Sequence, residues 1–288
     1  MPPPAFERGR GGRMLRLLER NVATIQDRLV LLAPSESSIP SSFNNVSADT
    51  DLHGQLVREM QRLRGAIYLG DGAIREHQLS DDGLHQTPED QKSWHLLMLN
   101  KRQEVSACAW YLQHETNVTL EDLRVRSCPL SESPTDRDHL ARAVESEIRR
   151  AGKDRLKYAE VGGWAVSKEC RCTSEGLVLA LAAYSLGRVC GGVLGITTAT
   201  VRHSSSTILR RLGGSSLEYR GRNVPAYFDQ RYDCEMELLR FDSRRPSRKY
   251  EGLVQMLQER LTDVRVIAAL DEPAYRGVQP YLPQLATV

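Results

Sequence analysis

Apolar and polar positions change their spacing several times along the chain, and each change predicts an element. Residues 13–32 repeat apolar side chains at helical spacing, and the same spacing returns from residue 51 to about residue 69. Two short apolar runs, 94–99 and 105–112, flank a polar tetrapeptide, which is typical of a β-hairpin. The first half of the chain therefore predicts helices around one strand pair.

Strands and helices alternate in the second half. We expect helices at 138–152, 174–189, 203–212 and 247–262, with strands at 156–166, 192–199, 231–241 and 264–269. A paired hairpin followed by alternating elements predicts an α/β (α+β) fold, with a mixed sheet and helices on both of its faces.

Local composition divides the chain into three parts. Residues 1–50 combine a disordered start, the amphipathic helix 13–32 and a linker at 33–50 rich in Ser, Pro and Asn. Residues 51–270 form the compact domain. Residues 271–288 form a tail with three prolines. The helix 13–32 has two interpretations. It packs on its own domain or on a second copy of the chain, or it lies on a membrane surface with Arg13, Arg16 and Arg20 on its polar side.

The overall composition argues against several classes of protein. The 288 residues carry a net charge of +2 and only 6% aromatic residues, so no global field or stacking surface indicates nucleic acid. None of the six cysteines forms a C-x-x-C pair, so we expect reduced thiols and no metal site. Without a signal peptide or a long apolar run, the sequence predicts a cytoplasmic protein.

The stretch from Tyr158 to Gly214 contains the candidate chemistry. It reads strand, polar turn, helix, strand, helix, and the turn holds Arg171-x-x-Ser174-x-Gly176 at the start of a helix. Small residues let the backbone approach a ligand, and the free N–H groups of a first helical turn bind anions. The alternative is a plain helix start with Ser174 as its N-cap.

Two further positions flank this turn. Glu160 lies on the preceding strand, where a carboxylate beside a cleft is suited to accept the proton of an attacking amine; it is otherwise a strand-end Glu that faces water or pairs with an Arg. Thr197 belongs to a run of hydroxyl residues ending near Arg202 that is suited to line a gap between strands, or forms an ordinary strand followed by a capping serine.

These positions resemble the GNAT superfamily of N-acyltransferases. The turn Arg171-x-x-Ser174-x-Gly176 is similar to its Arg/Gln-x-x-Gly-x-Gly/Ala loop. Three more features resemble the branch of acyl-homoserine-lactone synthases and long-chain N-acyl amino acid synthases over about residues 58–245: an Arg-x-x-x-Tyr motif at Arg64, Asp90 before an apolar strand, and a strand Glu at Glu160.

The resemblance implies a GNAT-like fold, whose central strands part near Trp164 and Thr197, preceded by an N-terminal helical arm. It implies transfer of an acyl group from acyl carrier protein or acyl-CoA to a small-molecule amine such as an amino acid. In that case Glu160 receives the amine proton and Arg64 and Asp90 organise the acceptor. The donor arm is then held by Val166, Arg171, Ser174, Gly176 and Thr197.

Departures from the family pattern leave a second interpretation open. Gly163 and Tyr111 stand where the lactone synthases have arginines, and Leu209 stands where many GNAT enzymes have a tyrosine acid; Tyr184 or Tyr219 are the other tyrosines considered for that role. The alternative function is a catalytically inactive module that binds an acyl thioester or a partner. For the enzyme, we expect an acyl pocket lined by Leu97, Val193 and Leu194, no nucleic-acid partner, and either a monomer or a homodimer.

Overall fold

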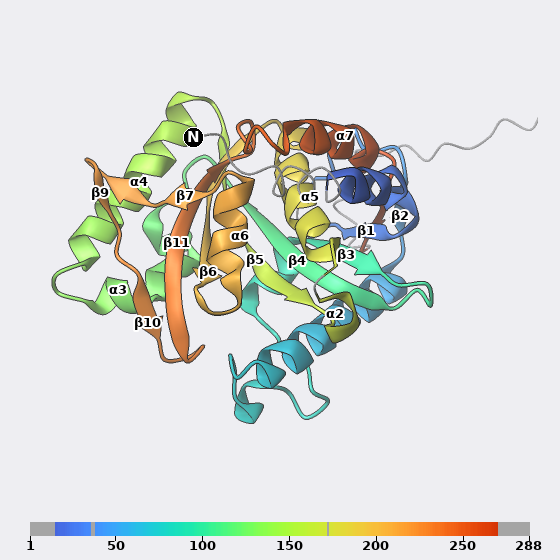
Figure 1. Cartoon of the computed structure of the whole chain (residues 1–288), viewed down its shortest axis with the longest axis horizontal. Helices are drawn as coiled ribbons and strands as arrows, with labels where there is room; N and C mark the ends of the chain where they lie inside the picture. The colour runs from blue at the N-terminus through green and yellow to red at the C-terminus, as the bar shows by residue number, and fades with distance from the viewer. Residues whose placement is uncertain (1–14, 36–37, 172, 270–288) are drawn as a thin grey trace, which may run out of the picture.

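A single mixed β-sheet runs through the protein. The computed structural model describes residues 15–35, 38–171 and 173–269, and its ten-stranded sheet has the order β10-β11-β6-β5-β4-β3-β1-β12-β2, with β7 also paired to β11 (Figure 1). The strands of this sheet are β1 (Leu29–Leu32), β2 (Val46–Ala48), β3 (Trp94–Leu99), β4 (Val105–His114), β5 (Lys157–Val166), β6 (Val193–Thr200), β7 (Ser215–Ser216), β10 (Tyr227–Asp229), β11 (Cys234–Asp242) and β12 (Arg265–Ala268). A separate two-stranded ribbon pairs β8 (Glu218–Tyr219) with β9 (Arg222–Asn223).

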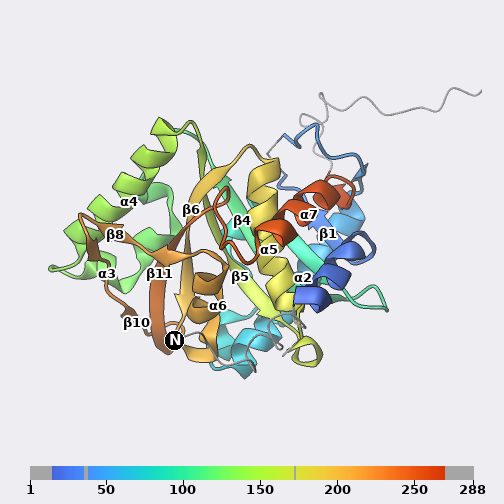
Figure 2. The ribbon, with the colours of Figure 1, turned by 45° about the horizontal axis from the view of Figure 1, so that its top comes forward.

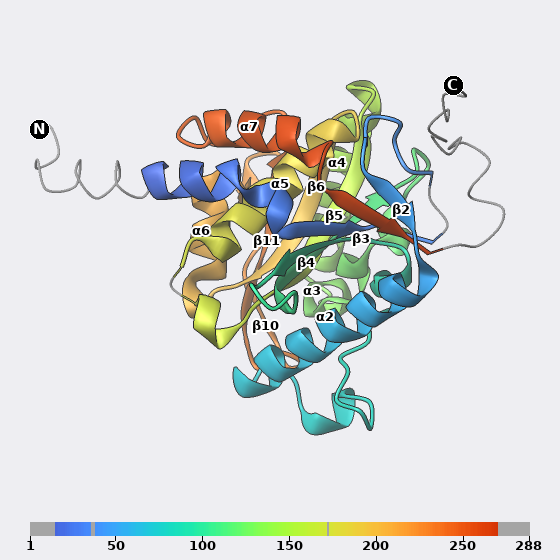
Figure 3. The ribbon, with the colours of Figure 1, turned by 90° about the vertical axis from the view of Figure 1, so that its right-hand side faces the viewer.

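Helices cover both faces of this sheet. The α-helices are α2 (Thr50–Gly70), α3 (Pro129–Glu132), α4 (Arg137–Lys153), α5 (Glu175–Val189), α6 (Ser205–Leu212) and α7 (Glu251–Leu261), and residues 15–23 are also helical. Seen along the sheet, α5 and α7 lie on one side and α2 lies on the other (Figure 3). Turned forward, α6 lies beside β6 and β11, and α4 lies at the other end from α2 (Figure 2). The predicted mixed sheet with helices on both faces is therefore confirmed.

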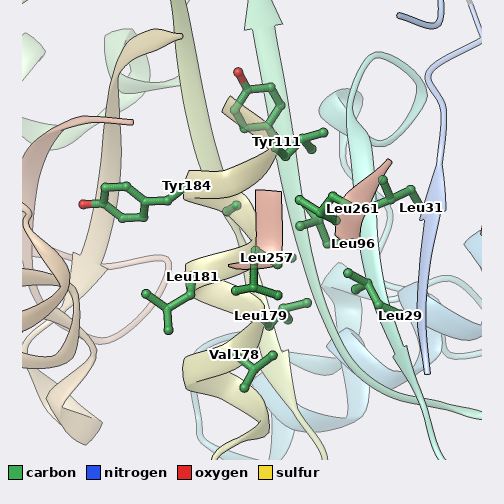
Figure 4. Close-up of a cluster of buried hydrophobic side chains, with 14 of the residues drawn as sticks. Leu29, Leu31, Leu96, Tyr111, Val178, Leu179, Leu181, Tyr184, Leu257 and Leu261 are labelled. Carbon is green, nitrogen blue, oxygen red and sulfur yellow. The ribbon is translucent and has the colours of Figure 1, made fainter. Parts of the chain in front are cut away.

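The largest core cluster lies between the sheet and the pair α5 and α7. Leu179 and Leu181 of α5 and Leu257 of α7 are fully buried there against Leu96 and Tyr111 of the sheet (Figure 4). Because α5 is enclosed by the sheet on one side and α7 on the other, it is apolar around most of its circumference rather than along one stripe. This helix is the rigid support for the strand ends described below.

The N-terminal segment belongs to this core, which corrects two predictions. The predicted helix 13–32 ends at residue 23, and Leu29–Leu32 form β1 between β3 and β12. Four consecutive buried apolar residues satisfy helical spacing by coincidence but are typical of a strand covered on both faces. The predicted linker 33–50 also contributes β2, so the boundary at residue 51 does not separate an appendage from the domain.

The interpretation of that helix as a packing helix on its own domain is favoured. Leu18 and Val22 are fully buried in the core cluster that contains α5 and α7. The predicted disordered start at residues 1–12 and the tail 271–288 lie outside the described residues. Within the described part of the chain, no helix combines the length and the apolar character that crossing a lipid bilayer requires.

The remaining elements match their predictions to within a few residues. The hairpin is β3 and β4, and the alternating second half is α4, β5, α5, β6, α6, β11, α7 and β12. Helix α2 begins where expected because the side chain of Asp49 accepts a hydrogen bond from the N–H of Leu52 at 2.9 Å.

A β-bulge in β5 parts the two central strands. Cys108 of β4 pairs with Ala165 of β5, and Trp110 pairs with Gly162. One residue lies between the two positions on β4, whereas two residues lie between their partners on β5. The extra residue on β5 shifts the alternation of its side chains, and Gly163 within it has a φ of +62°. Parallel pairing of β5 with β6 ends at Val161 and Thr197, whereas β6 continues along β11. The predicted separation near Trp164 and Thr197 is thus confirmed.

The bulge is filled by the indole of Trp110, which is 3% exposed. A Cβ atom built on Gly163 would lie 2.2 Å from Cδ1 of Trp110, which is closer than non-bonded carbon atoms approach one another. Only glycine therefore provides both the positive φ and the room for the ring.

Substituting Gly163 with alanine is expected to lower the free energy of unfolding by roughly 2–4 kcal/mol, because backbone strain adds to overpacking against Trp110. Gly72→Ala is the matched control, since Gly72 also has a positive φ of +70° but nothing lies within 4 Å of its Cβ position. We expect that variant to cost only about 1 kcal/mol. Urea unfolding of both variants measures the difference, and equal losses would contradict the packing role of Trp110.

Candidate functional site

The separation of β5 from β6 opens into a cavity of about 740 Å³. Its walls come from α2, β4, β5, α5, β6, α6 and the β10–β11 turn, so both faces of the sheet contribute to it. The site residues predicted from the sequence that line it are Arg64, Glu160, Val166, Arg171, Gly176 and Thr197. The bulge therefore brings together residues that are more than a hundred positions apart in the chain.

Glu160 lies on the wall of the cavity, with only 4% of the residue exposed. Its two carboxylate oxygens accept hydrogen bonds from the backbone N–H of Arg124 at 3.1 and 3.0 Å. Nε2 of His114 lies 3.0 Å from Oε1 of the same carboxylate. The interpretation of Glu160 as a solvent-facing strand end is thus wrong, since the carboxylate is buried and held by neighbouring groups.

Arg64 lines the cavity on the side formed by α2. Its Nη1 and Nη2 atoms donate to Oδ1 and Oδ2 of Asp90 at 2.8 and 2.7 Å, in a buried bidentate ion pair. Its Nε donates to Nδ1 of His85 at 3.1 Å, which requires that nitrogen to be unprotonated. Asp90 itself lies behind Arg64 and does not line the cavity, so it contacts a ligand only through Arg64.

Burial and charge shift the pKa values in this network. Burial alone would raise the pKa of Asp90, but its hydrogen bond with Arg64 and the Arg64 charge outweigh it and hold the pKa below the ordinary value. Burial, followed by the charge of Arg64, lowers the pKa of His85 to about 4. Burial also lowers the pKa of His95, whose Nε2 contacts the Asp90 carbonyl oxygen at 2.7 Å, to about 4. At neutral pH the network is one ion pair with two neutral histidines.

Arg124 and Tyr232 both line the cavity and contact each other. Nη2 of Arg124 donates to the Tyr232 hydroxyl at 2.6 Å, and Nη1 donates to Glu89 at 3.1 Å. The Arg124 guanidinium also lies over the Trp110 ring, 5.9 Å from its centroid. Nη2 of Arg202, at the end of β6, donates to the carbonyl oxygen of Tyr232 at 3.0 Å. A continuous line of polar groups therefore connects Glu160 to Arg202.

The start of α5 is built differently from the prediction for Ser174. The Ser174 hydroxyl accepts a hydrogen bond from Asn21 of the N-terminal helix, is buried, and makes no capping bond to α5. Ser174 therefore occupies the N-cap position, as the alternative interpretation predicts, but its side chain does not cap the helix, and it does not line the cavity. Nη2 of Arg171 donates to both carboxylate oxygens of Asp71, at 2.9 and 2.7 Å, and Glu175 pairs with Arg28.

Gly176 allows β5 and α5 to approach each other closely, whereas the approach to a ligand that the sequence predicts at this turn stays a prediction. A Cβ atom there would lie 3.1 Å from Cγ2 of Val166 and 3.2 Å from Cζ2 of Trp164. The end of β5 therefore packs directly on the first turn of α5, and both elements face the cavity at this point.

The three apolar residues that were expected to line an acyl pocket do not line this cavity. Leu97, Val193 and Leu194 are fully buried in the three core clusters and do not line the cavity. The apolar walls are formed instead by side chains that lie along α5, β6 and α6, namely Leu177, Ala180, Ala183, Ile196, Ala199, Ile208 and Leu209. Of the two tyrosines considered as acids, Tyr184 lines the cavity and Tyr219 does not.

Several residues of the site were missed from the sequence. Trp110, Arg124 and Tyr232 all line the cavity, and His114 supports Glu160 from outside it. Arg124 lies in an irregular polar stretch without periodicity, so no pattern marks it. The Nε1 atoms of Trp110 and Trp164 are buried without a hydrogen-bond partner in the described structure, which is uncommon for an indole.

Positive charge predominates around the cavity. Six arginines but only three acidic residues belong to the described lining, which favours an anionic ligand. Across residues 15–35, 38–171 and 173–269, no group of three or more His, Cys, Asp or Glu side chains is placed to hold a metal ion.

Comparison with known proteins finds similarity in solved structures only. No family model matches the chain, and no curated protein matches it. The CoA-dependent acyl-homoserine lactone synthase BjaI, solved with MTA, is 13% identical with a TM-score of 0.49, over 86% of this chain and 95% of that chain. FeeM, an N-acyl amino acid synthase from uncultured soil microbes, is 12% identical with a TM-score of 0.41, over 63% of this chain and 82% of that chain.

An acyl-CoA N-acyltransferase from Pseudomonas aeruginosa is 13% identical with a TM-score of 0.36, over 65% of this chain and 89% of that chain.

Acidification from pH 6.5 to 4 is expected to reduce the free energy of unfolding through His85 and His95. The pKa of each ring falls from 6.5 in the unfolded chain to about 4 in the folded protein. The unfolded chain therefore binds protons first, and each histidine contributes a loss on the order of 3 kcal/mol that is complete near pH 4. At lower pH, protonation of Asp90 adds to this loss, because the pKa of Asp90 is also lowered.

Urea unfolding across this pH range measures the effect. In His95→Gln, which removes one of the two titrating rings, we expect the slope of unfolding free energy against pH to fall by about half between pH 6.5 and 4. A slope equal to that of the wild type would show that His95 is not buried in its neutral form.

Proposed function

We propose that the protein is an N-acyltransferase that moves an acyl group from a thioester, on acyl carrier protein or coenzyme A, to the amine of a small molecule such as an amino acid. The observation that supports this most directly is the separation of β5 from β6 beside the buried carboxylate of Glu160. A slot between two strands accommodates the extended arm of a thioester, and a carboxylate next to it is placed to receive the amine proton.

The reaction is a direct attack of the amine on the thioester. The amine nitrogen forms a bond to the carbonyl carbon, the carbon–sulfur bond breaks, and the thiolate leaves. An N–H bond of the amine breaks and its proton passes to the carboxylate of Glu160. Backbone N–H groups at the end of β5 near Val166 would polarise the carbonyl oxygen as negative charge develops on it.

The donor arm would enter between the end of β5 and the start of α5. Val166, Gly176 and Thr197 line this part of the cavity, and Arg171 lies at its exposed edge. Ser174 would act indirectly, because its hydroxyl fixes the N-terminal helix against α5 rather than facing the cavity. The acyl chain would extend along the apolar walls formed by α5 and α6.

The acceptor would occupy the end lined by Arg64, Tyr68, Arg124 and Arg202. Arg64 is held rigidly by Asp90, so these two residues shape the site. Arg202 is the more available cation, because no carboxylate of the described residues lies within ion-pair distance of its guanidinium. A carboxylate on the acceptor would pair with Arg202 while its amine faces Glu160.

Purified protein is expected to form N-acylated products when acyl-CoA or acyl carrier protein is mixed with a panel of amino acids and amines, as measured by mass spectrometry. Replacing Glu160 with Gln should lower kcat by about a hundredfold, because the amide accepts no proton. Glu237→Gln, which alters an acid bonded to Arg210 outside the cavity, is the matched control and should retain activity.

Each result separates the candidate functions. Thermal stabilisation by acyl-CoA without product across the whole panel would contradict the transferase and favour the inactive binding module. A product formed equally well by the wild type and the Glu160 variant would remove Glu160 from the reaction.

Arg202→Gln is expected to raise KM for an amino acid acceptor by about tenfold, since a charge-assisted hydrogen bond to its carboxylate is lost. The same variant should use the corresponding decarboxylated amine as well as the wild type does. Arg210→Gln, on the neighbouring helix but outside the cavity, serves as control. An equal effect of Arg202→Gln on both acceptors would contradict carboxylate recognition by Arg202.

A further inference from the structure

His114 is the last residue of β4 and lies against the carboxylate of Glu160. Its Nε2 atom is 3.0 Å from Oε1, and the side chains of the two residues are 10% and 5% exposed. Both atoms otherwise present lone pairs, so this contact requires a proton between them. Glu160 lines the cavity whereas His114 does not, so His114 acts on the cavity only through Glu160.

Glu160 also accepts hydrogen bonds from Arg124, which lies in the segment after β4. The backbone N–H of Arg124 donates to both oxygens of Glu160, at 3.1 and 3.0 Å. With His114 on Oε1, that oxygen accepts two hydrogen bonds, whereas Oε2 accepts one. Oε2 is thus the atom with a free lone pair, and the two donors fix the plane in which it lies.

Charged and titratable groups surround this pair from each neighbouring element. Tyr158 of β5 lies opposite His114 in the sheet register, and Asp122 of the short helix Leu120–Asp122 is within electrostatic range of the imidazole. The guanidinium of Arg124 lies on the cavity side, where it binds Glu89 and Tyr232. Of these groups, the His114 imidazole is the side chain in hydrogen-bond contact with Glu160.

We propose that His114 is a positioning residue for the general base, which holds Oε1 so that Oε2 faces the attacking amine. This inference rests on the proposed acyltransferase function. As the amine nitrogen bonds to the thioester carbon, an N–H bond breaks and an O–H bond forms at Oε2. When the carbon–sulfur bond breaks, the same proton passes to sulfur, which restores the carboxylate and releases a thiol. His114 keeps its Nε2 proton on Oε1 throughout.

Two substitutions test the hydrogen bond of His114. His114→Leu removes it, and kcat should fall at least about tenfold while KM stays within about twofold, because only the orientation of the base changes. His114→Gln retains an N–H donor, so kcat should recover to within about threefold of the wild type.

His139→Leu is the matched control, because His139 is a partly exposed histidine of α4 that contacts only the backbone of Arg222 and the ring of Tyr219. Thermal unfolding of all variants verifies that they fold, and a folded His114→Leu with wild-type kcat overturns the inference. A kcat of His114→Gln no higher than that of His114→Leu overturns it as well. Failure of the wild type to transfer any acyl group overturns the proposed function itself, so the two failures are distinguishable.

Discussion

The bulge at Gly162 and Gly163 is the constraint on which the rest of the structure depends. A regular parallel pair would continue its hydrogen bonds to the end of both strands and leave no space between them. One extra residue in β5 ends that pairing at Val161, and β6 stays ordered because β11 holds its other edge. Trp110 fills the space that two missing side chains leave, so the bulge is a packed feature rather than a defect.

Burying the polar groups beside this bulge costs desolvation free energy, and different interactions compensate for each group. Arg64 is neutralised by Asp90 and saturated by His85, so its charge is fixed in place. Arg124 divides its donors between Glu89, Tyr232 and, through its backbone, Glu160. Arg202 alone among these three arginines contacts no acid of the described residues, and the proposed function assigns the acceptor carboxylate to it. The site therefore combines a preorganised polar frame with a cation that forms no ion pair within the described residues.

The periodicity of the sequence predicted most of the fold. From α2 onward the predicted helices and main strands differ from the observed ones by a few residues, because their apolar spacing continues over two or more turns or alternates strictly. The failure at residues 29–32 has a physical cause. A short strand covered on both faces is apolar at every position, and next to an amphipathic helix it extends the helical pattern without a break.

The site was only partly predictable for a different reason. Glu160, Arg171 and Gly176 lie on or beside regular elements, so the strand and helix patterns located them. Arg124 and Tyr232 lie on irregular segments, and only the three-dimensional path of the chain brings them to the cavity. The prediction for Leu97, Val193 and Leu194 failed for a related reason. These apolar residues pack in the core, and the sequence alone does not distinguish an apolar side chain that fills the core from one that lines a cavity.

Glu160 connects these levels, because its carboxylate serves the fold and the proposed chemistry together. Its hydrogen bonds with the backbone N–H of Arg124 hold the start of the helix Arg124–Ser127, and this places the Arg124 guanidinium over Trp110. The same bonds orient the carboxylate, as does His114. A base held by three such contacts needs little reorganisation when it receives a proton, since its donors are already in place. Glu160 therefore helps to hold Arg124 over Trp110 and, in the proposed function, is already oriented to accept a proton.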